Sequence, residues 1–257
     1  MNRHFSTLLW FLKRPRYLLH LPTRLRSLLK SDSMLTDSEV QSLSARLVNY
    51  EVSRETLVDF LVSAPLQSFE SGEPALFEEA KKEIAALPSN LRMGGSADVD
   101  ILYTLTKSLN PVRILETGVA HGWSSLALLA GCQRPDSKLV SVDLPYINSP
   151  KEGIVGHLVP AHFRDRWVLL RYPDFIGVRI AMKMYSHFDV FHYDSDKSYS
   201  GKLRTLNYVY KRMEPNGIII VDDVNDNFAF LDFCELNSLT PMIARYGKKK
   251  IGAVIKL

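Results

Sequence analysis

The sequence predicts an α/β fold, in which a mostly parallel sheet ends in an antiparallel hairpin and follows an N-terminal helical extension. Two observations support this prediction. From about residue 110 onward, short apolar runs of strand length alternate with segments of helical periodicity, as is typical of repeated βα units. The last two apolar runs, 241–246 and 251–257, are joined by a short turn that contains Gly247, which indicates a hairpin.

The length and composition suit a globular protein with one α/β domain and an extension in front of it. The chain has 257 residues, of which 46% are hydrophobic and 23% are charged. Cys132 and Cys234 stand apart, and the histidines lack the spacing of metal ligands, so we expect neither a disulfide framework nor a structural zinc site. These features fit a reducing, cytoplasmic setting.

We expect residues 1–90 to form the extension and residues 91–257 to form the ligand-binding domain. Residues 1–30 interleave leucine and aromatic side chains with seven basic residues, and the first acid is Asp32. Such a segment could lie on an anionic membrane surface, or its apolar face could pack on the domain or on a second subunit, which is the more usual role of a leucine stripe. Nucleic-acid binding is not expected, because leucine dilutes the charge.

Helix-start signals divide the remainder of the extension. Thr36-Asp-Ser-Glu39 is a capping box that predicts a helix running to about Asn49, and Ser53 is expected to cap a second helix toward Val62. A third helix is expected over 75–87, behind a proline suited to a first helical turn. The extension is therefore predicted to be helical.

The stretch from Ile114 to Ser125 organises the second domain. A buried strand ends at Glu116, a turn contains Gly118 and Gly122, and a helix follows with Ser124 in its first turn. Such a turn directs backbone N–H groups and a positive helix end toward a ligand, and glycine lets that ligand approach closely. The alternative is that the two glycines only close a βα loop.

A second acid strengthens the ligand-binding interpretation. Asp143 ends the next predicted strand, 138–142, so Glu116 and Asp143 lie at the sheet edge where open α/β sheets bind ligands. Asp143 is placed to accept hydrogen bonds from ribose hydroxyls, whereas an acid at the glycine turn suits an amino-bearing ligand. We therefore expect a nucleoside without phosphates. Ala120 stands where a dinucleotide motif has its second glycine, which argues against the competing class of nucleotide-dependent oxidoreductases.

The run LETGVAHGWSS, followed by VSVDLP, resembles motif I and the ribose-binding acid of class I S-adenosylmethionine-dependent methyltransferases. The resemblance implies a Rossmann-like methyltransferase sheet and S-adenosyl-L-methionine as the cofactor. It implies that the cofactor is bound by Glu116, Gly118, Gly122, Ser124 and Asp143. Gly94, in a turn before the first helix of the domain, would border the methionine half of the cofactor, although a plain loop is the alternative. Relatives carry an acid for adenine after the third strand, where this chain has Arg-Tyr-Pro-Asp174, so no adenine contact is assigned.

Acidic residues follow two further strands that we expect to be neighbours. Asp194 comes at the end of the strand 188–194, and Asp222 and Asp223 follow the strand 218–221. Carboxylates brought together in this way repel one another, and Mg²⁺ or another hard divalent cation bound by oxygen would relieve the repulsion. Lys197 is an alternative counter-ion, or a general base. Solvated strand ends remain the simpler alternative.

The motifs FDVFHYDSDKSY and VDDV are similar to those of metal-dependent catechol and caffeoyl-CoA type O-methyltransferases. The resemblance implies that Asp194, Asp222 and Asp223 bind the cation and that Lys197 takes the proton of the acceptor hydroxyl. The second acid of the pair is usually Asn in those enzymes. Sugar and secondary-metabolite methyltransferases are also similar, with His in place of Lys197. We therefore expect O-methylation of a small molecule or sugar, the alternative being a cofactor-binding protein without catalysis.

Overall fold

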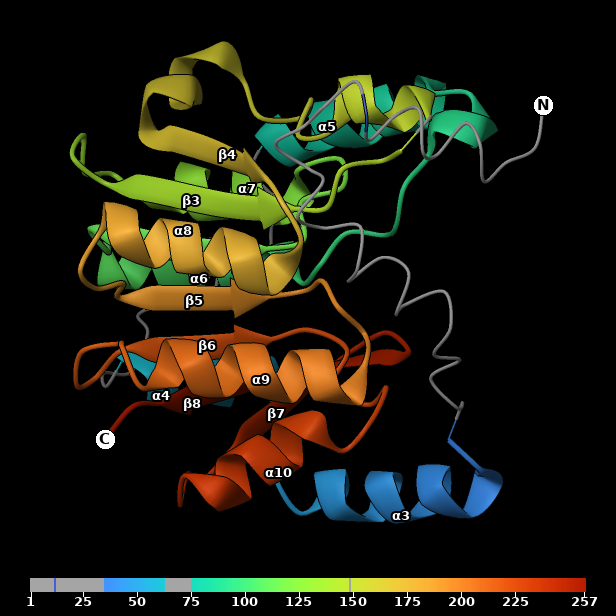
Figure 1. The fold of residues 1–257 in the computed structure, drawn as a ribbon, viewed down its shortest axis with the longest axis vertical. Coiled ribbons are helices and arrows are strands. Elements are labelled where there is room, and N and C mark those ends of the chain that lie inside the picture. The colour runs from blue at the N-terminus through green and yellow to red at the C-terminus, as the bar shows by residue number, and fades with distance from the viewer. Residues whose placement is uncertain (1–11, 13–34, 63–74, 148) are drawn as a thin grey trace.

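The computed structural model describes residues 12, 35–62, 75–147 and 149–257. The strands are β1 (Glu51–Val52), β2 (Arg113–Thr117), β3 (Lys138–Asp143), β4 (Trp167–Arg171), β5 (Val190–Tyr193), β6 (Ile218–Val221), β7 (Met242–Tyr246) and β8 (Lys249–Ile255). They form one sheet in the order β1-β7-β8-β6-β5-β2-β3-β4 (Figure 1). All its pairs are parallel except those of β8 with β6 and β7. The predicted Rossmann-like sheet with a C-terminal hairpin is confirmed.

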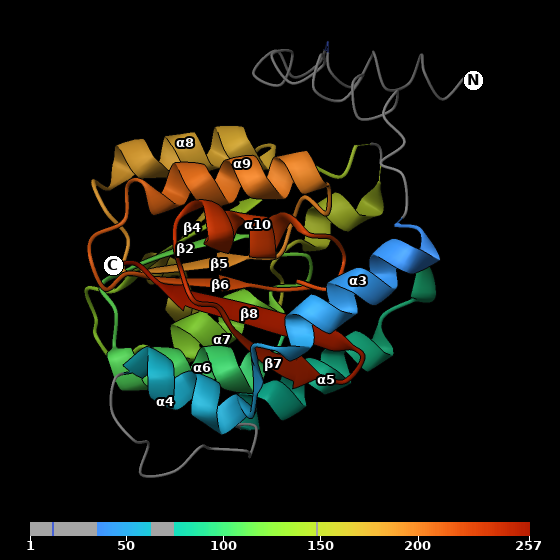
Figure 2. The same cartoon turned by 90° about the horizontal axis from the view of Figure 1, so that it is seen from below.

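Helices cover both faces of the sheet (Figure 2). They are α3 (Asp37–Val48), α4 (Arg54–Val62), α5 (Ala75–Ala86), α6 (Val99–Leu109), α7 (Trp123–Gly131), α8 (Asp174–Met184), α9 (Tyr199–Tyr210) and α10 (Ala229–Leu236). One hydrophobic core lies under α4, α5, α6 and α7, and the other lies under α8, α9 and α10 and also takes in Leu43 and Leu47 of α3. Helix α8 was not predicted from the sequence.

The extension begins its helices where the sequence predicts. The hydroxyl of Thr36 accepts from the N–H of Glu39 at 3.4 Å, and the carboxylate of Glu39 accepts from the N–H of Thr36 at 2.8 Å. The hydroxyl of Ser53 accepts from the N–H of Thr56 at 3.0 Å. These contacts confirm the capping box and the second cap.

The prediction that the extension is helical is wrong at β1, a two-residue strand between α3 and α4 that pairs in parallel with β7. The N–H of Ile243 donates to the carbonyl of Tyr50 at 3.0 Å, and Lys250 forms an ion pair with Glu51. Contacts with residues nearly 200 positions away create this strand, so local periodicity cannot reveal it. Apart from Leu12, residues 1–30 lie outside the described residues, and so does their expected membrane or subunit contact. In the described part of the chain, no helix is long and apolar enough to cross a membrane.

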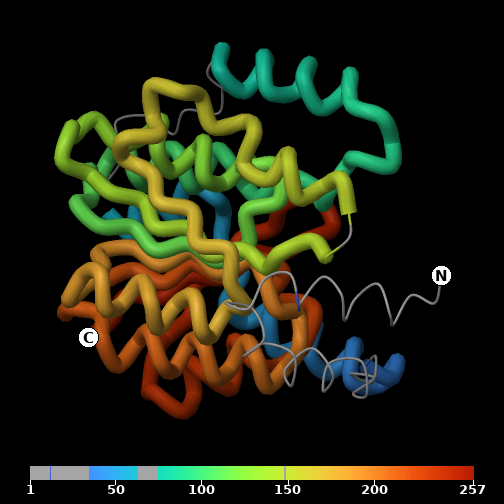
Figure 3. The backbone as a smooth tube through the Cα atoms, turned by 45° about the horizontal axis from the view of Figure 1, so that its top comes forward, coloured from blue at the N-terminus to red at the C-terminus, as the bar shows by residue number. Residues whose placement is uncertain are grey.

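Two features of the sheet position the functional site. Strands β5 and β6 are parallel neighbours, with Tyr193 beside Val221, which confirms that the ends of these strands lie together. The long connection 144–166 leaves the sheet between β3 and β4 (Figure 3) and contains the 3₁₀ turns η3 (Pro150–Ile154) and η4 (Ala161–Arg166). The strands that carry the predicted acidic residues therefore end at one edge of the sheet, and these residues lie beside the connection.

Candidate functional site

A cavity of about 640 Å³ opens at the carboxyl edge of the sheet. Seven of the ten residues that the sequence singles out line it, namely Gly94, Gly118, Ser124, Asp143, Asp194, Lys197 and Asp223. The other three, Glu116, Gly122 and Asp222, are not part of its lining. The structure thus brings the glycine turn and the second acidic motif around one space, although they are about 75 residues apart in the sequence.

The glycine turn lies against the end of β5. Gly118 has a φ of 85°, and a Cβ at this position would lie 1.8 Å from the carbonyl oxygen of Asp194. The N–H of Asp194 donates to the carbonyl of Thr117 at 2.8 Å, which fixes the two strand ends side by side. Glycine is therefore required at position 118 by the contact between β2 and β5, independently of any ligand.

Gly122 has a different environment, because it faces the connection between β3 and β4. Its φ is 99°, and a Cβ there would lie 3.1 Å from the Cα of Gly156. The N–H of Gly156 donates to the carbonyl of Ala120 at 2.9 Å, so this connection is fastened to the glycine turn. Gly122 thus allows α7 to begin beneath the connection.

Asp143 joins the end of β3 to the glycine turn. One of its carboxylate oxygens accepts from the N–H of Ala120 at 2.9 Å and from the N–H of Val119 at 3.3 Å. The guanidinium of Arg171 lies 3.5 Å from the same oxygen. Burial raises the pKa of Asp143, while Arg171 and the two N–H groups oppose this change. Asp143 therefore shapes the turn and also faces the cavity.

Glu116 points into the protein core. Its Oε2 accepts from the hydroxyls of Ser125 at 2.5 Å and Ser141 at 2.6 Å, and its Oε1 lies 3.7 Å from Nδ1 of the buried His192. Burial opposes the charged form of His192, but nearby carboxylates, above all that of Glu116, outweigh burial and raise its pKa. The carboxylate of Glu116 thus connects β2 with α7 and β3 beneath the cavity.

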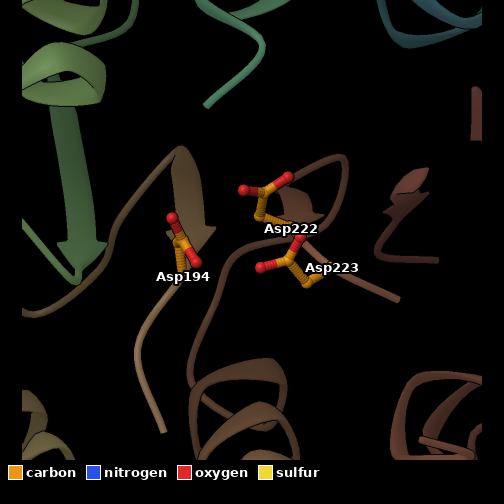
Figure 4. A group of neighbouring side chains, drawn as sticks. All are labelled: Asp194, Asp222 and Asp223. Atoms are coloured by element: carbon orange, nitrogen blue, oxygen red, sulfur yellow. The ribbon is translucent and has the colours of Figure 1, made fainter. Parts of the chain in front are cut away.

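Asp194, Asp222 and Asp223 converge beyond the ends of β5 and β6 (Figure 4). One carboxylate oxygen of each lies within 4.8 Å of the others. Consecutive residues of an extended strand point to opposite faces, but Asp223 has a φ of 50°, in the left-handed region. This backbone turn lets the carboxylates of Asp222 and Asp223 face the same site.

The three carboxylates differ in their partners. Asp222 is only 1% exposed, and neither of its carboxylate oxygens has a hydrogen-bond partner among the described residues. Its burial, together with the nearby charges of Asp194 and Asp223, raises its pKa to about 6. Asp223 is also buried, yet Lys197 and Lys249 lower its pKa. Buried oxygens without partners are costly, and a cation bound at these acids would lower that cost.

Lys197 and Lys249 approach the acids from different elements. Nζ of Lys197 contacts Asp194 and lies 2.7 Å from Oδ2 of Asp223. Burial opposes its charge, but the two carboxylates raise the pKa of Lys197 above its usual value. Nζ of Lys249, at the start of β8, lies 3.0 Å from Oδ1 of Asp223 and 3.7 Å from Oδ2 of Asp222. Sequence reasoning missed Lys249, for which the run of three lysines in the hairpin was the only signal.

Asp174, at the start of α8, is a second cavity residue to which the sequence assigned no role. Its carboxylate accepts from the hydroxyl of Ser195 and from the N–H of Asp196, the latter at 3.1 Å. Burial raises the pKa of Asp174 to about 6. It therefore links the beginning of α8 to the segment that follows Asp194.

Comparison with known proteins identifies the class to which this fold and cavity belong. Residues 115–224 match the family described as a methyltransferase domain. This part of the chain is therefore a class I S-adenosylmethionine-dependent methyltransferase domain, which confirms the resemblance seen in the motifs. No curated protein matches the sequence.

Solved structures of methyltransferases share the fold. An O-methyltransferase from Bacillus cereus in complex with SAH is 18% identical with a TM-score of 0.57, over 79% of this chain and 96% of that one. The SAH-bound methyltransferase of Podospora anserina is 17% identical with a TM-score of 0.52, and the match covers 86% of this chain and 97% of that one. A candidate caffeoyl-CoA O-methyltransferase from Staphylococcus aureus is 12% identical with a TM-score of 0.54, over 79% and 98%.

Proposed function

We propose that this protein transfers a methyl group from S-adenosylmethionine to a hydroxyl oxygen of a small molecule or sugar. The observation that carries the proposal is a single cavity lined both by the glycine turn with Asp143 and by Asp194, Asp223 and Lys197. Methyl transfer requires the donor carbon and the acceptor oxygen to be aligned and the acceptor to lose a proton. A shared cavity would allow the donor and acceptor to be aligned, and the groups around the acid cluster would promote loss of the proton.

Cofactor binding is assigned to the residues around the glycine turn. The carboxylate of Asp143 faces the cavity and would accept hydrogen bonds from the ribose hydroxyls. Gly94, Gly118 and Ser124 also line the cavity and would contact the remainder of the cofactor. Glu116 and Gly122 would support cofactor binding without touching the cofactor, because they fix the position of α7 relative to the turn. The SAH-bound relatives with this fold support the assignment.

A divalent cation such as Mg²⁺ is assigned to Asp194, Asp222 and Asp223. The donor set consists of carboxylate oxygens, which hard cations prefer, and the two oxygens of Asp222 are buried without hydrogen-bond partners in the described part of the chain. When bound, the cation supplies positive charge that lowers the pKa of an acceptor hydroxyl. Asp194 and Asp223 raise the pKa of Lys197, in the cavity wall, and hold it as an ammonium group. It would therefore serve as a counter-ion, and it would accept the hydroxyl proton only after losing its own.

Two measurements test the proposal. Titration calorimetry with S-adenosylmethionine and with NADH is expected to show binding of the former alone. Formation of S-adenosylhomocysteine with a panel of catechol, phenol and sugar acceptors is expected to fall after exhaustive chelation and to recover when Mg²⁺ is restored. Asp222→Ala should bind the cofactor without this recovery, whereas the exposed control Asp165→Ala should behave as the parent. Unchanged turnover after chelation would remove the metal from the proposal, and cofactor binding without turnover would favour a non-catalytic binding protein.

A further inference from the structure

We propose that Lys249 is a built-in competitor of the divalent cation, whose ammonium group occupies the Asp222–Asp223 pair and thereby sets how tightly the site binds metal. The inference rests on the proposed metal site and deepens it. It concerns a residue that comes from the C-terminal hairpin, outside the segment 115–224 that matches the methyltransferase family.

The three consecutive lysines of the hairpin have three different environments, so they do not form one basic surface. Lys248 lies in the turn and is exposed. Lys250 is buried and forms an ion pair with Glu51 of β1. Lys249 lies between them, points to the opposite face of β8 from Lys250, and contacts the acid cluster. The pleat of the strand therefore directs this one lysine to the acids.

The contacts of Lys249 overlap those that a metal would make. Its Nζ lies 3.0 Å and 3.2 Å from the two carboxylate oxygens of Asp223, and 3.7 Å from Oδ2 of Asp222. A cation bound by one oxygen from each of the three acids needs an oxygen of Asp223. Oδ2 of that residue already accepts from the ammonium groups of Lys197 and Lys249, and Oδ1 lies 3.0 Å from Nζ of Lys249. Metal binding thus requires at least one ammonium group to move.

The charge of the cluster leads to the same conclusion. Three carboxylates and the ammonium groups of Lys197 and Lys249 sum to a charge of −1 when all five groups are ionised. Without Lys249 the sum is −2, so the attraction for a divalent cation increases while a nearby positive charge disappears. This single loss of positive charge strengthens metal binding.

Lys249, rather than Lys197, is the competitor at the buried acid. Lys197 contacts Asp194 and Asp223, whereas Lys249 contacts Asp223 and Asp222, the acid whose oxygens have no hydrogen bonds among the described residues. The side chain of Lys249 is 39% exposed at the mouth of the cavity, while that of Asp222 is 1% exposed. The ammonium group can therefore withdraw toward solvent when a metal enters, at the cost of its ion pairs.

Mn²⁺ binding to the chelated full-length protein, measured by electron paramagnetic resonance in the presence of S-adenosylmethionine, tests the inference. Lys249→Met and Lys249→Gln are expected to bind Mn²⁺ about tenfold more tightly than the parent, or better. Lys249→Arg, which keeps the charge, and Lys248→Met, the neighbouring exposed control, are expected to stay close to the parent. Titration calorimetry with S-adenosylmethionine verifies that each variant is folded.

The outcomes separate this inference from the proposed function. Parent-like or weaker Mn²⁺ binding by both Lys249→Met and Lys249→Gln would overturn the inference alone, because the parent would still bind the metal. If neither the parent nor these variants bind Mn²⁺ while all bind S-adenosylmethionine, the metal site and the inference both fall, and the cofactor assignment stands. Tight binding only after loss of the Lys249 charge would show that this lysine suppresses the site.

Discussion

Replacing Asp222 by asparagine is expected to stabilise the metal-free protein and, at the same time, to remove divalent cation binding. The Asp222 carboxylate is 1% exposed, has no hydrogen-bond partner among the described residues, and lies close to Asp194 and Asp223. Ionisation therefore costs free energy in the folded state, and the ammonium group of Lys249, 3.7 Å from Oδ2, offsets this cost only in part. Asparagine keeps the shape of the side chain without its charge.

The magnitude follows from the pKa of Asp222, which is raised from 3.8 to about 6. Because each tenfold change in proton affinity corresponds to about 1.4 kcal/mol, the ionised carboxylate lowers the free energy of unfolding by about 3 kcal/mol. The folded protein binds this proton more tightly than the unfolded chain does. Stability is therefore lost as the pH rises from about 4 through 6, and the loss is complete above that window.

Urea denaturation in the presence of a chelator, at pH 4.5 and pH 7.5, measures this effect. The free energy of unfolding of Asp222→Asn, relative to the parent, should be higher at pH 7.5 than at pH 4.5 by about 2 kcal/mol, because part of the loss is already present at pH 4.5. The exposed control Asp165→Asn should show no such difference. Added Mn²⁺ should stabilise the parent but not Asp222→Asn. An Asp222→Asn variant that is less stable than the parent by the same amount at both pH values would refute the reasoning.

Three further predictions concern the cofactor and the N-terminal segment. Asp143→Ala removes a charged hydrogen-bond acceptor worth about 1.5–3 kcal/mol, so calorimetry should show S-adenosylmethionine binding weakened about 10- to 100-fold, and parent-like affinity would contradict the ribose assignment. Gly118→Ala should lower the melting temperature as well as cofactor binding, because its Cβ would lie 1.8 Å from a backbone oxygen, and an unchanged melting temperature would contradict that contact. A shortened chain beginning at Ser31 should bind the cofactor as the full chain does but differ in oligomer size or in binding to anionic vesicles. Loss of cofactor affinity in a folded shortened chain would oppose this, and unfolding would favour packing of residues 1–30 on the domain.

The sequence alone determined the order of the main elements and the edge of the sheet at which the site lies. Apolar runs predicted strands that the structure confirms, among them Trp167–Arg171, and the capping box at Thr36 predicted the start of α3. These signals are local, because periodicity and caps depend on residues within a few positions of each other. The proximity of Asp194 to Asp222 could also be predicted, since neighbouring parallel strands end at the same edge.

Only the tertiary structure decided which side chains face the cavity and which support it from behind. Glu116 and Gly118 are two positions apart, yet the carboxylate of Glu116 bonds to Ser125 and Ser141 in the core while Gly118 contacts the backbone of Asp194. Lys249 reaches Asp223 only because β8 lies beside β6 in a fixed register, and its neighbours in the lysine run point elsewhere. Side-chain direction at a strand end depends on register, on local φ values such as that of Asp223, and on contacts between distant segments, which local sequence patterns do not encode.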